Sequence, residues 1–405
     1  MPMRDAARAA CISRAFLRSW QSYPKLNFDM FTLGMFDLDR RQFDDPIEIE
    51  DEAAIIEEQM RTGVIATYQE YYKKNSPVIR EFSAIVDRIM HNHTGTGIKT
   101  FRLEPPHYQY IDPGVLDRWF HAMMAPGIIE FELHLNMGDD GLGYNFPCSL
   151  LSSDKGCSTI TSFTIAGCSI HSLDKVGCLT SLRRVLLHRM RVKGEELSCF
   201  LSCSLALEEL RLCYCNDIVC LKIHCLLSRL GLLYVQNCNS LKMVSCDAPK
   251  LKTFAYVGLP TVHICLGDSS PSVREMMMSS TDESGMICYA TTKLPSIAPN
   301  VRKLFLSSCF EIATDTPMKK LNKFRRLKYL QIQLDTPSHC PAYDFYSLVS
   351  FLNACPALVT FVLRLDMRDA DDAIPEYPHG VKSQGKKRMI PFLLPGKPPP
   401  APAAS

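Results

Sequence analysis

The chain has 405 residues, of which 46% are hydrophobic and 22% are charged, and its formal net charge is +2. The apolar content excludes a wholly disordered chain, and the balanced charge gives no reason to expect nucleic acid or an anionic membrane as a partner. No apolar run in the sequence reaches the roughly 18–20 residues that a membrane-spanning helix needs.

The N-terminal residues are expected to form two short helices. Residues 4–11 are rich in Ala and Arg, which favour helices, and a second helix would carry Phe16 and Trp20 on one side before Pro24 ends it. The opening "MPMRDAARAA" lacks the apolar core of a secretory signal. We therefore expect a chain of the cytosol or nucleus with reduced cysteines.

Residues 29–77 are expected to be an insertion or linker. Their acidic part, "DDPIEIEDEAAIIEEQMRTG", is typical of a solvated surface. After it, residues 77–93 place apolar side chains at helical spacing, which predicts an amphipathic helix that caps the structure that follows.

From residue 98 onward one pattern returns, apolar-x-x-apolar-x-apolar, in copies whose starts lie 21 to 32 residues apart. Most intervals fit the 20–29-residue period of leucine-rich repeats. A strand through this pattern points alternate side chains to opposite sides, and stacked repeats bury the apolar faces that no single repeat can enclose. Ordinary strands of another α/β fold are the alternative. The sequence predicts an α/β leucine-rich-repeat solenoid with a curved parallel sheet over residues 78–366. The copies begin at Ile98, Ile128, Ile160, Leu182, Leu207, Leu230, Leu251, Val273, Val301, Leu327 and Leu358.

The sequence contains 18 cysteines, and the repeat pattern accounts for four of them. Several copies place a cysteine eight positions after their start, among them Cys168, Cys215 and Cys238. Others, such as Cys199 and Cys225, are expected to pack as small hydrophobic side chains. Because no pair of Cys-x-x-Cys motifs has zinc-finger spacing, we expect no metal site, and nothing indicates a cofactor.

Side chains that flank the second and third apolar positions should point away from the core and form a binding face. Tyr and Arg, common anchors of interfaces, occur among them. No Gly-x-Ser-x-Gly or His-Glu-x-x-His motif is present, so we do not expect an enzyme. The residues predicted to bind a protein target on the concave face are Arg184, His188, Glu209, Arg211, Tyr234, Gln236, Lys303, Tyr329 and Gln331.

The C-terminal part should contain a helix near residues 345–352 and a last strand at 358–363. Residues 367–405 are expected to be a disordered tail. Its end, "PFLLPGKPPPAPAAS", is proline-rich and favours an extended conformation.

The N-terminal residues "PMRDAAR" (2–8), "SRAF" (13–16), Trp20 and "PKLNF" (24–28) resemble the second half of an F-box from the grass-type F-box/leucine-rich-repeat family. Residues 86–103 resemble that family's entry into its repeats, and the C-terminal helix and strand resemble the FBD-like ending of many plant F-box proteins. The resemblance implies a partial F-box over residues 1–28 that contacts the Skp-type adaptor of a cullin ubiquitin ligase. The implied adaptor-binding residues are Pro2, Asp5, Ile12, Phe16 and Trp20.

The chain departs from that family at its start, because an F-box normally opens with a Leu-Pro dipeptide and an apolar first helix. Without that helix, Ile12, Phe16 and Trp20 would be poorly covered, and we expect adaptor binding to be weakened or lost. Two functions follow. The chain is the substrate-recognition subunit of an SCF-type ligase, or it is a truncated leucine-rich-repeat module that binds the same target without recruiting the ligase.

Overall fold

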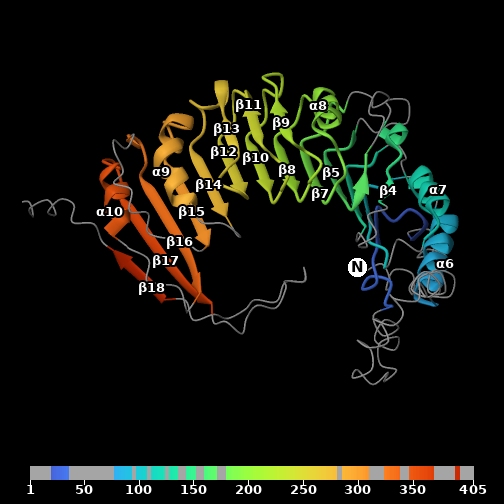
Figure 1. Cartoon of the computed structure of the whole chain (residues 1–405). Helices are drawn as coiled ribbons and strands as arrows, with labels where there is room; N and C mark the ends of the chain where they lie inside the picture. The colour runs from blue at the N-terminus through green and yellow to red at the C-terminus, as the bar shows by residue number, and fades with distance from the viewer. Residues whose placement is uncertain are drawn as a thin grey trace, which may run out of the picture. The chain divides into compact units, whose positions relative to one another are not determined.

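The computed structural model describes residues 20–35, 77–93, 97–106, 111–123, 127–135, 143–151, 159–170, 179–280, 285–309, 323–337, 346–368 and 388–392 (Figure 1). The chain divides into two compact units, Met1–Asp217 (unit 1) and Ile218–Ser405 (unit 2). Each unit contains a sheet of short parallel strands.

In unit 1, the described strands of the main sheet pair in the order β1-β2-β3-β5-β7-β8, and every one of these pairs is parallel. Parallel neighbours need crossover connections, which is why the chain between the strands is long. The elements of unit 1 are β1 (Lys25–Phe28), α6 (Pro77–Asn92), β2 (Thr100–Leu103), α7 (Pro113–Met123), β3 (Glu130–His134), β4 (Tyr144–Asn145), η2 (Cys148–Leu151), β5 (Ser162–Ala166), β6 (Cys168–Ser169), β7 (Arg184–His188), α8 (Gly194–Ser202) and β8 (Glu209–Cys213).

The core of unit 1 follows the repeat pattern directly. The residues at the second apolar position of the template are Cα partners in adjacent strands, and so are the residues at the third position. Both sets are buried, because alternate residues of a strand face the same side of the sheet. The first row carries stacked aromatic rings, with centroids 5.6 Å apart for Phe101 and Phe131 and 5.5 Å apart for Phe131 and Phe163. The two rows are Leu26, Phe101, Phe131, Phe163, Val185 and Leu210, and Phe28, Leu103, Leu133, Ile165, Leu187 and Leu212.

Helices α6 and α7 contact each other near the first strands. Phe82 of α6 packs edge-on against Trp119 of α7, with ring centroids 6.5 Å apart. The indole Nε1 of Trp119 donates a hydrogen bond to Asp87 Oδ1 at 2.7 Å, so the buried polar atom of the ring is satisfied. Helix α6 is the amphipathic helix that the sequence predicts at residues 77–93.

In unit 2, the described strands of the main sheet run β10-β12-β14-β15-β16-β17 in parallel, and β18 pairs antiparallel with β17. Helix α9 lies against β14 and β15. The elements of unit 2 are β9 (Cys220–Ile223), β10 (Leu232–Gln236), β11 (Met243–Cys246), β12 (Thr253–Val257), β13 (His263–Cys265), η6 (Gly267–Ser269), β14 (Glu275–Ser280), α9 (Met286–Ile297), β15 (Lys303–Cys309), β16 (Tyr329–Pro337), α10 (Tyr346–Asn353), β17 (Thr360–Arg368) and β18 (Arg388–Phe392).

Two buried rows again form the core, and each joins one template position of successive repeats. The register therefore confirms the predicted α/β leucine-rich-repeat fold. The rows are Leu233, Phe254, Met276, Leu304, Leu330 and Phe361, and Val235, Tyr256, Met278, Leu306, Ile332 and Leu363.

Unit 2 also contains a second parallel sheet, β9-β11-β13, that the sequence analysis did not predict. Its buried residues Leu221, Val244 and Ile264 are paired in one row. The connections between main-sheet strands thus carry short strands of their own, and these strands contribute buried apolar residues.

Two predicted boundaries differ from the structure. The sheet begins before residue 78, because β1 within residues 1–28 pairs in parallel with β2. At the other end, residues 367–405 were predicted to be disordered, yet β17 extends to Arg368 and β18 covers its open edge. An exposed edge strand presents unpaired backbone groups, and an added antiparallel strand satisfies them.

The predicted burial of the repeat cysteines is confirmed at Cys168, Cys215 and Cys238. The Cys215 thiol lies 3.6 Å from the Leu187 carbonyl oxygen of the preceding repeat, to which it can donate a weak hydrogen bond. Burial raises the pKa of the Cys168 thiol, which therefore stays protonated. Cys199 and Cys225 are exposed, so for them the predicted packing is wrong. They occupy the water-facing sides of α8 and of the turn after β9.

No helix within the described ranges has the length and apolar character that crossing a bilayer requires.

Candidate functional site: the outward strand faces

The outward face of each sheet consists of the strand residues that alternate with the buried rows. Arg184, His188 and Arg211 lie there in unit 1, and Tyr234 and Gln331 in unit 2. The full predicted set occupies such positions in β7, β8, β10, β15 and β16. The structure thus places these residues beside neighbouring strands of their own unit; that they bind a target stays a prediction.

The outward face of unit 1, which we call the polar face, is built around charged side chains. Arg102 Nη2 lies 2.8 Å from Glu104 Oε2, and Arg102 Nη1 lies 3.7 Å from Glu132 Oε2. The hydrogen bond to Glu104 raises the pKa of the Arg102 guanidinium further above its ordinary value. Arg184 reaches across one strand to Glu130, at 3.8 Å. Because these ion pairs are partly exposed, they add little to the stability of the fold. They do show how positive and negative side chains are arranged on the polar face.

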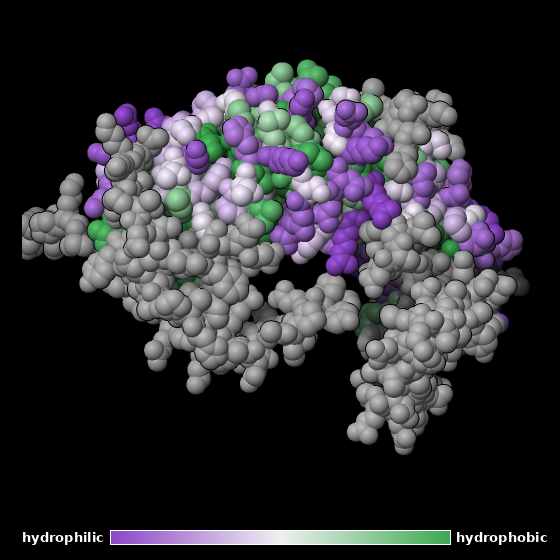
Figure 2. Space-filling view, viewed as in Figure 1, coloured by the Kyte–Doolittle hydropathy of each residue, from purple (hydrophilic) through white to green (hydrophobic). Residues whose placement is uncertain are grey.

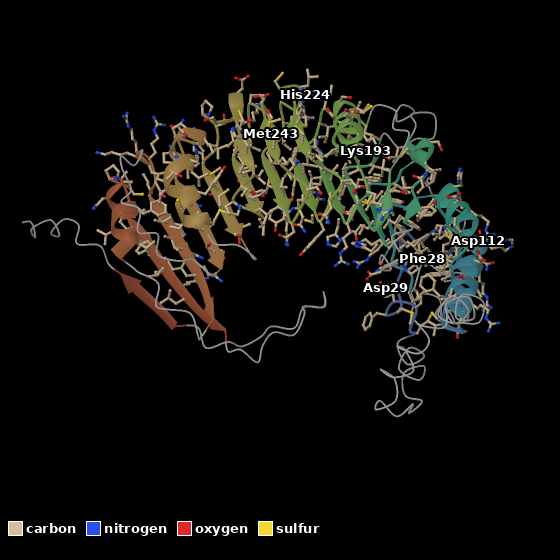
Figure 3. All side chains as sticks on the ribbon, viewed as in Figure 1. Phe28, Asp29, Asp112, Lys193, His224 and Met243 are labelled. Atoms are coloured by element: carbon tan, nitrogen blue, oxygen red, sulfur yellow. The ribbon has the colours of Figure 1, made fainter. Side chains whose placement is uncertain are left out.

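The first strand contributes to the polar face as well. Asn27 is the Cα partner of Arg102, and Asn27 Oδ1 and Arg102 Nε are buried atoms without a hydrogen-bond partner among the described residues. Phe28 is the last residue of this strand and enters the core, and Asp29 follows it (Figure 3). Asp29 Oδ1 accepts a hydrogen bond from the Thr32 amide at 2.6 Å. The sequence pattern does not single out Asn27 or Phe28 for this role, because residues 24–28 resemble the exit of an F-box.

At the carboxyl ends of β5, β7 and β8, one backbone position is left-handed in each repeat: Gly167 (φ 73°), Arg189 (φ 48°) and Tyr214 (φ 57°). Glycine takes this conformation freely, whereas Arg and Tyr take it at a cost of about 1 kcal/mol or more. Here the amide of Arg189 donates to the carbonyl of Cys213 at 2.8 Å. The strain therefore accompanies a tight turn that is repeated from coil to coil.

The turn residues form a small cationic and aromatic cluster. The guanidinium of Arg189 lies 5.7 Å from the ring centroid of Tyr214, and the His188 and Tyr214 rings meet edge-on at 5.4 Å. Figure 2 shows hydrophilic residues gathered near the lower ends of β7 and β8. The polar face is therefore richest in cations near β7 and β8, and richest in carboxylates near β2 and β3.

Burial lowers the pKa of both His134 and His188. The nearby Arg189 lowers the pKa of His188 further, whereas the carboxylates Glu104 and Glu132 partly oppose the effect of burial on His134. A histidine whose pKa is lower in the folded chain than in the unfolded chain contributes fully to stability above its unfolded pKa of about 6.5. That contribution is lost as the pH falls through the pKa of the folded chain. We expect the stability of unit 1 to decrease between about pH 7 and pH 5.

Urea titrations monitored by tryptophan fluorescence measure this effect, because both tryptophans, Trp20 and Trp119, belong to unit 1. The double variant His134→Gln, His188→Gln should show a smaller decrease than the wild-type chain. An unchanged pH dependence in the variant would contradict the assignment.

The outward face of unit 2 differs in chemistry. Its central row of Cα partners, which we call the apolar strip, consists of Tyr234, Ala255, Met277, Phe305, Gln331 and Val362. Apart from Ala255, which is buried, these residues are half-buried. In Figure 2 the residues over β12 and β14 are paler, that is, less hydrophilic, than those at β7 and β8.

Hydrogen bonds hold the aromatic residues of this face in place. Tyr329 Oη donates to Gln331 Oε1 at 3.0 Å, and Tyr234 Oη donates to Gln236 Oε1 at 2.9 Å. The Phe305 ring lies 5.4 Å from the Tyr329 ring. Beside the strip, Lys303 Nζ pairs with Glu275 Oε1 at 2.7 Å. The predicted residues Tyr234, Gln236, Lys303, Tyr329 and Gln331 thus surround an apolar centre, whose Met277 and Phe305 the sequence analysis missed.

Of the residues implied by the F-box resemblance, Pro2, Asp5, Ile12 and Phe16 lie outside the described residues. Trp20 is 8% exposed and stacks on Tyr23, with ring centroids 6.0 Å apart. It is therefore covered, contrary to the expectation that this side chain would be poorly covered. Within the described ranges, no group of three or more His, Cys, Asp or Glu side chains is placed to hold a metal ion.

The register, the buried rows and the repeated turns define a leucine-rich-repeat protein, a class whose domains are typically protein-interaction modules. Residues 89–386 match the family described as At1g61320/AtMIF1, LRR domain, a plant leucine-rich-repeat family, and the chain belongs to it. The match begins within α6, so β1 and β18 lie outside it. No curated protein matches the chain.

Proposed function

We propose that this chain is a receptor that holds a protein target against the outward strand faces. The observation that carries the proposal is the fixed alternation of buried rows with outward Arg, Tyr, Met and Phe side chains on rigid parallel strands. Aromatic residues, Met and Arg are enriched in the centres of protein interfaces, and residues mounted on strands keep their spacing better than residues on loops.

The finer form of the proposal is a substrate-recognition subunit of an SCF-type ubiquitin ligase, located in the cytosol or nucleus. The support is the resemblance of residues 1–28 to the second half of an F-box, which would bind a Skp-type adaptor. The chain would then act by proximity, because it raises the effective concentration of target lysines at the ligase. No bond is made or broken by the chain itself.

The alternative is a leucine-rich-repeat module that binds the target without recruiting the ligase. Two observations favour it. Residues Lys25–Phe28, the exit of the F-box-like segment, serve as the first strand of the sheet, and Trp20 is buried rather than available to an adaptor.

Co-purification with a purified Skp-type adaptor separates the two forms. If the chain recruits the ligase, it should form a stable stoichiometric complex with the adaptor; if it is the module that binds its target without the ligase, it should form none. A protein with a complete F-box serves as the positive control and should bind. A stable complex with the chain as it stands would establish adaptor recruitment and overturn the weakened-binding expectation.

A further inference from the structure

The apolar strip ends beside the last strand of unit 2. Strand β18 pairs with β17 so that Pro391 faces Val362 and Phe392 faces Phe361 in the register. Val362 is the last residue of the apolar strip. The chain therefore leaves the sheet at Phe392, one strand away from the strip, and residues 393–405 follow from that point.

The chemistry of the strip suits an extended, proline-rich segment. Such segments dock on grooves lined by aromatic side chains, because a polyproline II helix loses little conformational entropy on binding and packs its rings against flat π faces. Phe305 and Tyr329 present adjacent rings, and Tyr234 adds a third at the far end of the strip. The nearby charges of Glu275 and Lys303 neutralise each other, so the strip favours a segment with little charge.

Residues 393–405 have this composition. The sequence "LLPGKPPPAPAAS" contains two leucines, five prolines and a single charged side chain, Lys397. In a polyproline II conformation, with a rise of about 3.1 Å per residue, the segment spans roughly 40 Å. The distance from β18 across the strip to β10 is six strand spacings, roughly 29 Å at about 4.8 Å each. The segment is therefore long enough to follow the whole strip.

We propose that the apolar strip is a docking surface for the chain's own residues 393–405. Because the segment is tethered at Phe392, its effective concentration at the strip is in the millimolar range, so that even weak contacts fill the site. A protein target that uses Tyr234, Phe305 or Tyr329 must displace the segment, which sets a threshold for target binding. This inference goes beyond the receptor function and holds for either of its forms.

The test uses a fluorescent synthetic peptide of residues 393–405 and fluorescence anisotropy. A chain that ends at Phe392 should bind the peptide saturably. The full chain should bind the peptide with an affinity at least about tenfold lower, because its own segment competes for the strip. Phe305→Ala and Met277→Ala, each in the chain ending at Phe392, should reduce the affinity about tenfold, since both remove anchors from the strip. A peptide with Pro398, Pro399 and Pro400 replaced by alanine should bind equally poorly.

Phe31→Ala is the matched control, because Phe31 is 80% exposed and belongs to unit 1; this variant should bind the peptide like its parent. Thermal melts establish that each variant is folded, and the altered peptide tests the proposal even if one variant is not. The proposal is overturned if the chain ending at Phe392 shows no saturable binding, if the full chain binds equally well, or if both strip variants keep full affinity. Since the assay contains neither adaptor nor target, such a result would leave the receptor function standing.

Discussion

Replacing Phe131 by alanine is expected to lower the free energy of unfolding by about 3–5 kcal/mol, the cost typical of deleting a large buried aromatic side chain. Phe131 is 0% exposed. Its ring is surrounded by Phe101 at 5.6 Å, Phe163 at 5.5 Å and Phe146 at 5.9 Å. The cavity would lie between three successive strands, so neither neighbouring repeat can close it without moving its own ring.

Urea unfolding monitored by tryptophan fluorescence measures this loss in unit 1. The matched control is Phe31→Ala, which removes the same side chain from a position that is 80% exposed and should change stability by no more than about 0.5 kcal/mol. Similar losses in the two variants would mean that the phenylalanine row is not the packed core of the stacked repeats.

The substitution Leu330→Ala should cost unit 2 about 2–5 kcal/mol. Leu330 is 0% exposed and is the Cα partner of Leu304 on one side and Phe361 on the other. Its side chain therefore packs between two neighbouring repeats, and its truncation removes apolar contacts from both.

Because both tryptophans lie in unit 1, this loss is measured by urea unfolding followed with far-UV circular dichroism. Leu226→Ala, at a position that is 62% exposed in the same unit, is the control and should unfold at nearly the wild-type urea concentration. If Leu330→Ala unfolds together with the control, the predicted burial of the second template position is wrong.

The repeat pattern predicted the main sheets well, because its spacing is fixed by geometry. The template positions Phe131 and Phe163, or Leu304 and Leu330, become Cα partners as the stacking of repeats requires. The first strand was missed even though Tyr23, Leu26 and Phe28 fit the same template. Its distance from the next repeat in sequence, and its similarity to an F-box exit, concealed it.

The small sheet of unit 2 also corresponds to a regular spacing in the sequence. Leu221 and Val244 each lie 14 residues after the start of their repeat, and Ile264 lies 13 after its own. A short apolar pair between strands can belong to a helix, a turn or a strand, and periodicity alone does not separate them. Pairing across repeats selects the strand.

For the binding face, alternation with the buried rows located the predicted polar residues. Met277 and Phe305 occupy the same template position as Gln331, between the second and third apolar residues. They were missed because only polar and aromatic-hydroxyl side chains were selected at that position, and an apolar side chain there was not taken for part of a binding surface. The carboxylates Glu104 and Glu132 were missed for another reason, since they lie in or beside repeats whose match to the template is loose.

Site-specific photo-cross-linking tests the central claim most directly. A photoreactive phenylalanine analogue placed at Arg211, on the outward face of unit 1, or at Gln331, on the outward face of unit 2, should become covalently joined to a protein target that mass spectrometry identifies. The same analogue at Lys222, an exposed position of the small sheet, should not capture that target. Capture from Lys222 but from neither outward position would show that the target binds elsewhere and that the alternation of strand residues does not define the site.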